Sequence, residues 1–471
     1  MESLSLDFNN SAFGESSQPN AIYRLKPNET PADKTIVEIL ATKIEQIKAM
    51  KSLEKLTELL IYKKQIILQG PPGTGKTYTA KGMAYNMIMN RPLSNVSEER
   101  LKQLEQLSAT GQYSLIQFHP AYLYEDFVRG ITVESEGGSV KYETKNKLLA
   151  TFAKEALINY ENSKKNEEQL SKDVWFAEQF DNFVSSISDQ IANSHPVKLS
   201  KTRQITDVES NRFVYGAHDF LNFEQIKNLY NHDIRTVEEA RTSNILQDHV
   251  KWRMTYYIPI VHILADYLAK HPFVNVNAGK TELKKYILVI DEINRANLPA
   301  VLGELIYALE YRGEEVNGLY GIDGDHSMIL PPNLYIIGTM NTADRSVSHI
   351  DYAIRRRFGF ANILPNKTAV NGIAEPLFKK VSNLFIKNYD SLDWEDPKLQ
   401  RSDLLSADFQ PGDVWLGHSY FMTRETEEPK AVLELQKKLH FEIIPILYEY
   451  VKDGVLLPNA LEEIDQLMEA K

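Results

Sequence analysis

Three short segments of this 471-residue chain carry side chains suited to phosphoryl transfer. The first, GPPGTGKT at residues 70–77, matches the G-x-x-x-x-G-K-[ST] phosphate-loop pattern in full. In such a loop, backbone N–H groups at a helix N-terminus surround the phosphates. The lysine reaches the β- and γ-phosphates, and the final hydroxyl binds Mg²⁺. The pattern predicts a nucleoside triphosphate site in which Lys76 binds phosphate and Thr77 binds the metal.

The second segment is the acidic pair Asp291 and Glu292, which follows the apolar run YILVI at 286–290. A magnesium ion and an attacking water must be placed beside the γ-phosphate. We expect Asp291 to bind the metal and Glu292 to activate the water. The alternative, an acidic pair that only caps the next helix, is the weaker reading beside a complete phosphate loop. The expected nucleotide-binding residues are Gly70, Pro71, Pro72, Gly73, Thr74, Gly75, Lys76, Thr77, Tyr78 and Asp291, with Thr77 and Asp291 as metal ligands.

The third segment is TMN at 339–341, directly after the apolar run LYIIG at 334–338. An asparagine at the end of a strand is most often a turn former. Here Asn341 follows a predicted strand and precedes a charged segment. We therefore expect its amide to sense the γ-phosphate or to orient the water.

The elements that must position these groups are short buried strands separated by helices. Further short apolar runs are predicted as strands at 65–69, 114–118 and 360–364, and a helix is predicted from Thr35 to Leu60. A helical stretch also follows the phosphate loop. Such alternation indicates an α/β fold, with a parallel sheet covered on both faces by helices.

The chain is expected to divide into four parts. Residues 1–33 have the composition of a flexible tail, and 34–152 with 281–366 form the nucleotide-binding core. Residues 153–280 form a largely helical insertion, nearly balanced in charge, and 367–471 form a helical C-terminal domain. Within that last domain, helices are predicted at 376–389 and 437–451.

Composition excludes several classes of function. The chain has no cysteine, which removes disulfides, zinc-thiolate sites and cysteine nucleophiles. Its formal net charge of −11 is a poor match to sequence-independent DNA coating, which depends on Lys and Arg. No secretory signal or membrane-length apolar run is visible, so we expect a cytoplasmic protein without membrane contact.

Four segments together resemble the McrB family of AAA+ proteins. They are DEINRANLPAVLGELIYALE (291–310), MNTADRSVSHIDYAIRRRF (340–358), FHPAYLYEDFVRG (118–130) and LGHSYF (416–421). The resemblance implies an AAA+ core with a helical lid, and a hexameric ring of identical subunits. It also implies Mg²⁺-dependent hydrolysis of GTP, and the role of a motor subunit in a DNA restriction or anti-phage defence system. DNA cleavage would then belong to a separate McrC-like nuclease subunit, and DNA would be engaged through the complex.

The same resemblance implies roles for individual residues. Asn341 corresponds to the first sensor, and Asp344 with Arg345 completes a signature loop at the active site. Arg295, Arg356 and Arg357 correspond to arginines that act on the neighbouring subunit's nucleotide. Without the family, an arginine cluster at a helix end would more often cover the helix dipole or form surface ion pairs.

Two features depart from the family pattern. Trp415 stands two residues before the GHSYF stretch, where the family often has an arginine, which puts a lid arginine in question. Only residues 1–69 precede the phosphate loop, so we expect this subunit to read no methylated base itself.

Two other functions are considered. One is a remodelling chaperone of the MoxR type, which acts on a protein and shares every predicted catalytic residue. The other is a nucleotide-gated scaffold that does not turn over, which the presence of Glu292 and the arginines disfavours. The insertion and the partner would separate the first of these from a restriction motor. The phosphate loop contacts only phosphates, so GTP leads ATP only through the family resemblance. No NKxD guanine motif is visible.

Overall fold

The computed structural model describes residues 51–136, 139–216, 219–243, 251–275, 279–322, 325–344, 350–370, 372–424 and 427–469. The predicted tail at 1–33 and the first part of the predicted helix from Thr35 lie outside the described residues, as does Arg345. Residues 51–63 are helical. Within the described part of the chain, no helix is both long and apolar enough to cross a membrane. The chain divides into two compact units.

The first unit contains the described residues up to Ala121, together with Ile287–Leu298 and the chain from Tyr335 onward. At its centre is a parallel five-stranded sheet in the order β12-β1-β11-β8-β2. All five predicted strands are confirmed. The strands are β1 (Gln65–Gly70), β2 (Tyr113–Gln117), β8 (Tyr286–Asp291), β11 (Leu334–Asn341) and β12 (Gly359–Asn362).

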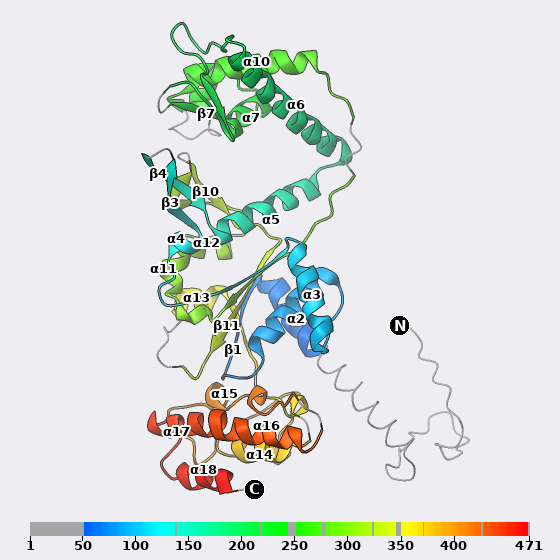
Figure 1. The fold of residues 1–471 in the computed structure, drawn as a ribbon, viewed down its shortest axis with the longest axis vertical. Helices are drawn as coiled ribbons and strands as arrows, with labels where there is room; N and C mark the ends of the chain where they lie inside the picture. The colour runs from blue at the N-terminus through cyan, green and yellow to red at the C-terminus, as the bar shows by residue number, and fades with distance from the viewer. Residues whose placement is uncertain are drawn as a thin grey trace, which may run out of the picture. The chain divides into compact units, whose positions relative to one another are not determined.

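Helices α2 (Lys76–Met89) and α3 (Ser97–Ala109) lie beside this sheet (Figure 1). Met83 and Tyr85 of α2 and Leu107 of α3 pack with alternate sheet residues such as Ile66 and Val289 into one apolar core. The central strands are buried on both faces, which explains their continuous apolar runs. The short helix η1 (Ile293–Arg295) directly follows β8, and the short helix α13 (Tyr352–Arg357) directly precedes β12.

The C-terminal part of the first unit is mostly helical and has its own core around Phe378, Phe385, Trp415 and Leu447. Its regular elements are η2 (Lys367–Ala369), α14 (Glu375–Ser382), η3 (Tyr389–Ser391), α15 (Pro411–Val414), η4 (His418–Tyr420), α16 (Lys430–Lys438), η5 (Leu439–Ile443), α17 (Ile444–Lys452) and α18 (Ala460–Glu469). The predicted helix at 437–451 is present. It contains the π-helical turn η5 just before Pro445, which has no N–H to continue the α-helical ladder.

The predicted helix at 376–389 is wrong in extent, because α14 ends at Ser382. The buried Ser382 hydroxyl donates to the Phe378 carbonyl at 2.6 Å and accepts from Trp415 Nε1 at 3.0 Å. The chain then turns, and Phe385 and Ile386 enter the core from non-helical backbone. Tertiary packing thus overrides the local helical pattern.

The second unit contains Tyr122–Tyr286 and Pro299–Leu334. One part has two antiparallel hairpins, which the sequence analysis did not predict, and several helices. These elements are α4 (Tyr124–Phe127), β3 (Arg129–Glu136), β4 (Ser139–Asn146), α5 (Leu148–Lys164), α11 (Leu298–Leu302), α12 (Leu305–Glu310), β9 (Glu315–Ile322) and β10 (Asp325–Ile329). The buried Arg129 links the hairpins, since its guanidinium donates to Asn146 Oδ1 and to the carbonyls of Tyr320, Asp325 and Ser327.

The remainder of the second unit is mostly helical and also contains a small antiparallel sheet, β5-β6-β7. Its elements are α6 (Glu167–Ala192), β5 (Asp207–Glu209), β6 (Arg212–Val214), β7 (Phe220–Asn222), α7 (Phe223–Asn231), α8 (Val237–Thr242) and α10 (Met254–Lys270). An aromatic-rich core that includes Phe180, Phe183 and Phe213 lies within this segment. Helix α5 runs through the domain boundary that we drew between residues 152 and 153.

Candidate nucleotide-binding site

The phosphate loop joins β1 to α2 at the carboxyl end of the sheet, and its glycines allow the tight path. Gly73 and Gly75 have φ values of 80° and 79°, a region that strains residues with a side chain. The Lys76 ammonium lies within the loop, where it donates to the carbonyls of Gly70 at 3.0 Å and Pro71 at 2.8 Å. Burial lowers the pKa of Lys76 to about 8, although Glu292 and Asp291 favour its charged form.

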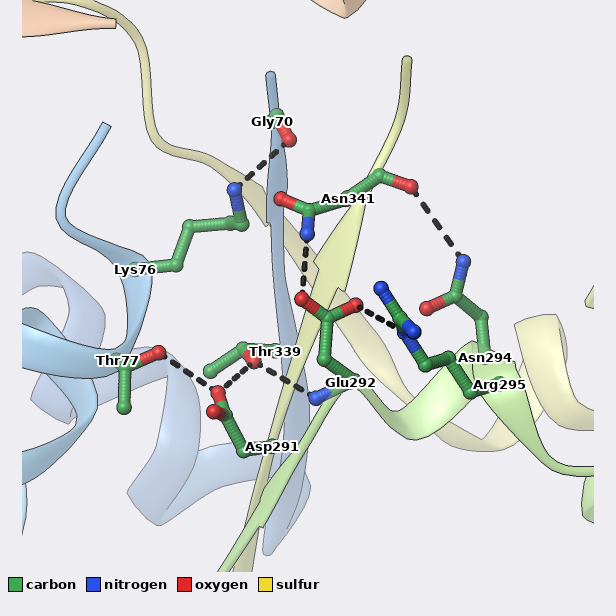
Figure 2. A network of polar contacts seen from close by, with 9 residues as sticks. All are labelled: Gly70, Lys76, Thr77, Asp291, Glu292, Asn294, Arg295, Thr339 and Asn341. Atoms are coloured by element: carbon green, nitrogen blue, oxygen red, sulfur yellow. Dashed lines mark hydrogen bonds and ion pairs between the residues drawn. The ribbon is translucent and has the colours of Figure 1, made fainter. Parts of the chain in front are cut away.

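The strand β8 places Asp291 beside the first helical turn after the loop. Thr77 Oγ1 donates to Asp291 Oδ1 at 2.7 Å, and the same carboxylate oxygen accepts from the buried Thr339 hydroxyl (Figure 2). A hydroxyl and a carboxylate are hard oxygen donors of the kind that Mg²⁺ takes in nucleotide sites. The residues predicted as metal ligands are therefore in direct contact with each other.

Glu292 follows Asp291 with φ 53° and ψ 46°, a left-handed conformation that is rare outside glycine. Its backbone N–H donates to Thr339 Oγ1 at 3.2 Å, and its Oε1 accepts from Asn341 Nδ2 at 2.5 Å. The backbone turn thus brings the Glu292 carboxylate to the end of β11. Residues held in such conformations are enriched at active sites.

Two further side chains hold this pair in place (Figure 2). Arg295 Nε lies 3.5 Å from Glu292 Oε2, so Arg295 pairs with the glutamate of its own chain. The buried Asn294 donates from Nδ2 to the Asn341 carbonyl at 3.4 Å. Asn294 and Thr339 were missed in the sequence analysis. The sequence did contain a signal for Thr339. Residues i and i+2 of a strand lie on the same face, and Asn341, two residues after Thr339, was predicted as a site residue.

The arginine cluster lies at the other end of the sheet from the phosphate loop. It occupies the last turn of α13, and the Arg357 carbonyl accepts from Gln65 Nε2 at 2.7 Å. Gln65 begins β1 and Gly70 ends it, a span of about 16 Å in an extended strand. This is farther than an arginine side chain reaches. Arg356 and Arg357 therefore do not join the phosphate site of their own chain.

Other predicted residues lie at the edge of the site. The Tyr78 hydroxyl donates to Asn95 Oδ1 at 2.6 Å, and Arg100 lies over its ring. Thr74 is buried and donates to the Pro71 carbonyl at 3.1 Å, which supports the loop from within. Asp344 is partly buried and follows β11, just before the segment of Arg345 that lies outside the described residues.

Comparisons with known proteins find an AAA domain in the part of the chain that contains the acidic pair. Residues 201–358 match the family described as AAA domain (dynein-related subfamily). This range contains Asp291, Glu292 and Asn341 but begins after the phosphate loop, which the long insertion separates from them. The loop is therefore assigned from its motif and its contacts.

Two curated relatives belong to restriction systems. The chain is 38% identical over 182 residues to the "Type IV methyl-directed restriction enzyme EcoKMcrB subunit" of Escherichia coli (strain K12), covering 36% of this chain and 38% of that protein. It is 34% identical over 104 residues to the "Type II restriction enzyme BsuMI component YdiS" of Bacillus subtilis (strain 168), covering 19% of this chain and 30% of that protein. The chain thus spans less than half the length of either relative. Together with the phosphate-loop geometry, these matches show an AAA domain that is similar in sequence to part of the McrB subunit.

Proposed function

We propose that this chain is a Mg²⁺-dependent nucleoside triphosphatase that works as a ring and drives or licenses a partner nuclease on DNA. The observation that carries the proposal is the convergence of three groups at the carboxyl end of the sheet. They are the phosphate loop, the Thr77–Asp291 pair and the Glu292–Asn341 pair. Phosphoryl transfer needs a phosphate cradle, a metal site and a placed water, and these groups correspond to the three requirements.

Lys76 and Thr77 would bind the substrate. Lys76 donates to two loop carbonyls, and phosphate oxygens would take their place as acceptors. Thr77 Oγ1 and Asp291 Oδ1 would hold Mg²⁺, which would neutralise the negative charge of the phosphates. The distance of 2.7 Å between Thr77 Oγ1 and Asp291 Oδ1 places two suitable oxygen ligands side by side.

Glu292 would activate the attacking water. Asn341 occupies Oε1 and Arg295 lies beside Oε2, so both carboxylate oxygens are oriented before substrate arrives. A carboxylate that is held in place accepts a proton from water without a prior rearrangement. Asn341 and Arg295 act here by positioning Glu292. For Asp344 and Arg345 we retain the role in the active-site loop that the family resemblance implies.

Arg356 and Arg357 would act on the nucleotide of a neighbouring subunit. Their distance from their own phosphate loop along β1 leaves action across an interface as the way for them to reach a γ-phosphate. A cation supplied in this way typically contributes about 10³–10⁵ in rate. This requirement for a neighbour supports a ring, and the family resemblance supports a hexamer.

GTP is the favoured nucleotide and the restriction role is favoured over protein remodelling. The restriction role is supported by the relatives, which are named as components of restriction enzymes. The preference for GTP rests on the family resemblance alone. We further infer that the insertion, with its own core and balanced charge, engages the substrate or the partner. A cytoplasmic location is in keeping with this role.

Phosphate release from GTP and from ATP tests the proposal, with and without DNA and the product of the adjacent reading frame. We expect turnover by the wild type, faster with GTP, and stimulation by the partner and DNA. Lys76→Ala should lose triphosphate binding. Lys81→Ala, in the same helix, is the matched control and should retain it. Equal turnover by the wild type and Lys76→Ala would show that the activity arises elsewhere.

A further inference from the structure

The helical C-terminal domain contacts the phosphate loop through residues 417–419. Gly417 N–H donates to the Pro72 carbonyl and Ser419 N–H donates to the Gly73 carbonyl, both at 3.0 Å. A Cβ added to Gly417 would stand 2.1 Å from the Gly73 carbonyl carbon, so the two backbones approach as closely as glycine permits. These two bonds flank His418 and fix its backbone against the loop.

The His418 ring reaches the residue that directly precedes Lys76. Its Nε2 is the nearest atom, at 3.6 Å, to the position that a Cβ on Gly75 would occupy. Gly75 is also the N-cap of α2, where backbone N–H groups face a bound anion. The Nε2 edge of the ring therefore lies at the phosphate loop.

The hydrogen bond on the other ring nitrogen sets the tautomer. Asn366 N–H donates to His418 Nδ1 at 3.2 Å, so Nδ1 accepts and carries no proton. In the neutral ring the proton is then on Nε2. Burial lowers the pKa of His418 to about 4, which keeps the ring neutral near pH 7. No group in the described part of the chain accepts a hydrogen bond from Nε2.

We propose that His418 is a nucleotide-binding residue whose Nε2–H donates to a phosphate oxygen of the nucleotide held by residues 70–77. The inference rests on the proposed function. It assigns to His418 a contact between the helical C-terminal domain and the nucleotide. Trp415 does not make such a contact, because it is buried in the C-terminal core and donates to Ser382. An N–H donor that is oriented by its backbone and has no acceptor among the described residues is suited to an anionic oxygen.

Two amide substitutions of His418 distinguish the role of Nδ1 from the role of Nε2. In His418→Gln the amide nitrogen stands near the Nε2 position, whereas His418→Asn retains an acceptor for Asn366 N–H and lacks the distal donor. We expect His418→Asn to raise the Kd of Mg-GTP by about ten- to one hundred-fold, the range for a hydrogen bond to a charged group. His418→Gln should recover most of the affinity. The matched control His440→Asn, at an exposed histidine of the same domain, should leave the Kd unchanged.

Calorimetric titration of the full chain with Mg-GTP and Mg-ATP gives the deciding readout, with the Tm of each variant as the folding check. A phosphate contact predicts the same fold-change for both nucleotides. A fold-change confined to one base would overturn the assignment, as would wild-type affinity in His418→Asn. If Lys76→Ala still loses binding in that case, the proposed function stands and only this inference fails. If the wild type binds neither nucleotide, both are wrong.

Discussion

Glu292, which we propose as the residue that activates water, has a left-handed backbone conformation. A left-handed backbone costs on the order of 1–3 kcal/mol for a residue with a side chain, and the surrounding bonds to Thr339 and Asn341 compensate for it. Glu292 stands at the N-cap position of η1, but its side chain makes no capping hydrogen bond there.

Glu292→Gln should therefore separate binding from turnover. The amide keeps the size of the side chain but cannot accept a proton, so turnover should fall by about 10²–10⁴. The Kd for triphosphate should stay within about twofold, because Lys76 and the loop are unchanged. Phosphate release and equilibrium titration measure the two effects. Glu462→Gln, in α18, is the control, and near wild-type hydrolysis by Glu292→Gln would refute the assignment.

The lowered pKa of Lys76 predicts a pH dependence of binding. Below about pH 8 the free protein carries the ammonium that phosphate requires. Above about pH 8, Lys76 must take up a proton when the nucleotide binds. The Kd should therefore increase with pH, approaching a tenfold increase per pH unit. Titrations between pH 6.5 and pH 9.5 measure this, with Lys76→Arg as the variant that stays charged. A flat profile for the wild type would contradict the shifted pKa.

At the scale of elements, the segment 417–419 positions the C-terminal domain on the phosphate loop. Gly417→Ala forces a Cβ into the backbone of Gly73, and neither backbone can yield as a flexible side chain would. We expect nucleotide affinity to fall by about tenfold or more, with a smaller change in Tm because the C-terminal core is separate. Gly372→Ala meets nothing within 4 Å and is the matched control. Unchanged affinity in Gly417→Ala would show that this contact is dispensable.

The insertion is a second element whose role can be tested separately from that of the nucleotide-binding core. Asn159 of α5 donates to the Glu282 carbonyl at 3.0 Å and accepts from Lys284 N–H at 2.8 Å, so the chain leaves and returns at neighbouring points. Replacing residues 166–278 with a flexible linker of about ten residues should therefore preserve the core. We expect basal hydrolysis to be retained and activity with the nuclease partner to be lost. Full coupled activity of the shortened chain would show that the insertion has no such role.

At the scale of the whole molecule, hydrolysis should require neighbouring subunits. An Arg356→Ala, Arg357→Ala double variant has an intact loop, and Lys76→Ala has intact arginines. Each alone should be nearly inactive, and mixed rings should regain part of the activity wherever a good loop meets good arginines. Normal hydrolysis by the arginine variant, or no recovery in rings that demonstrably co-assemble, would exclude action in trans.

The sequence alone determined the elements whose signals are local. The loop at 70–77, the apolar strands and the acidic pair after YILVI are contiguous patterns, and each strand appears where its apolar run predicts. The parallel direction of the strands was also predicted from a local pattern, because buried strands alternate with helices along the chain.

Tertiary structure alone decided the contacts between segments far apart in the chain. Thr339, Asn294 and His418 lie within segments quoted in the sequence analysis, but their roles depend on the groups that they contact in the folded chain. Helix α14 ends where Ser382 binds Trp415, which no helical periodicity encodes. The arginine cluster follows the sensor strand closely in sequence, yet the register of β12 on β1 places it at the opposite end of the sheet. Periodicity reports local backbone preference, whereas these placements depend on packing and on hydrogen bonds between residues that are distant in sequence.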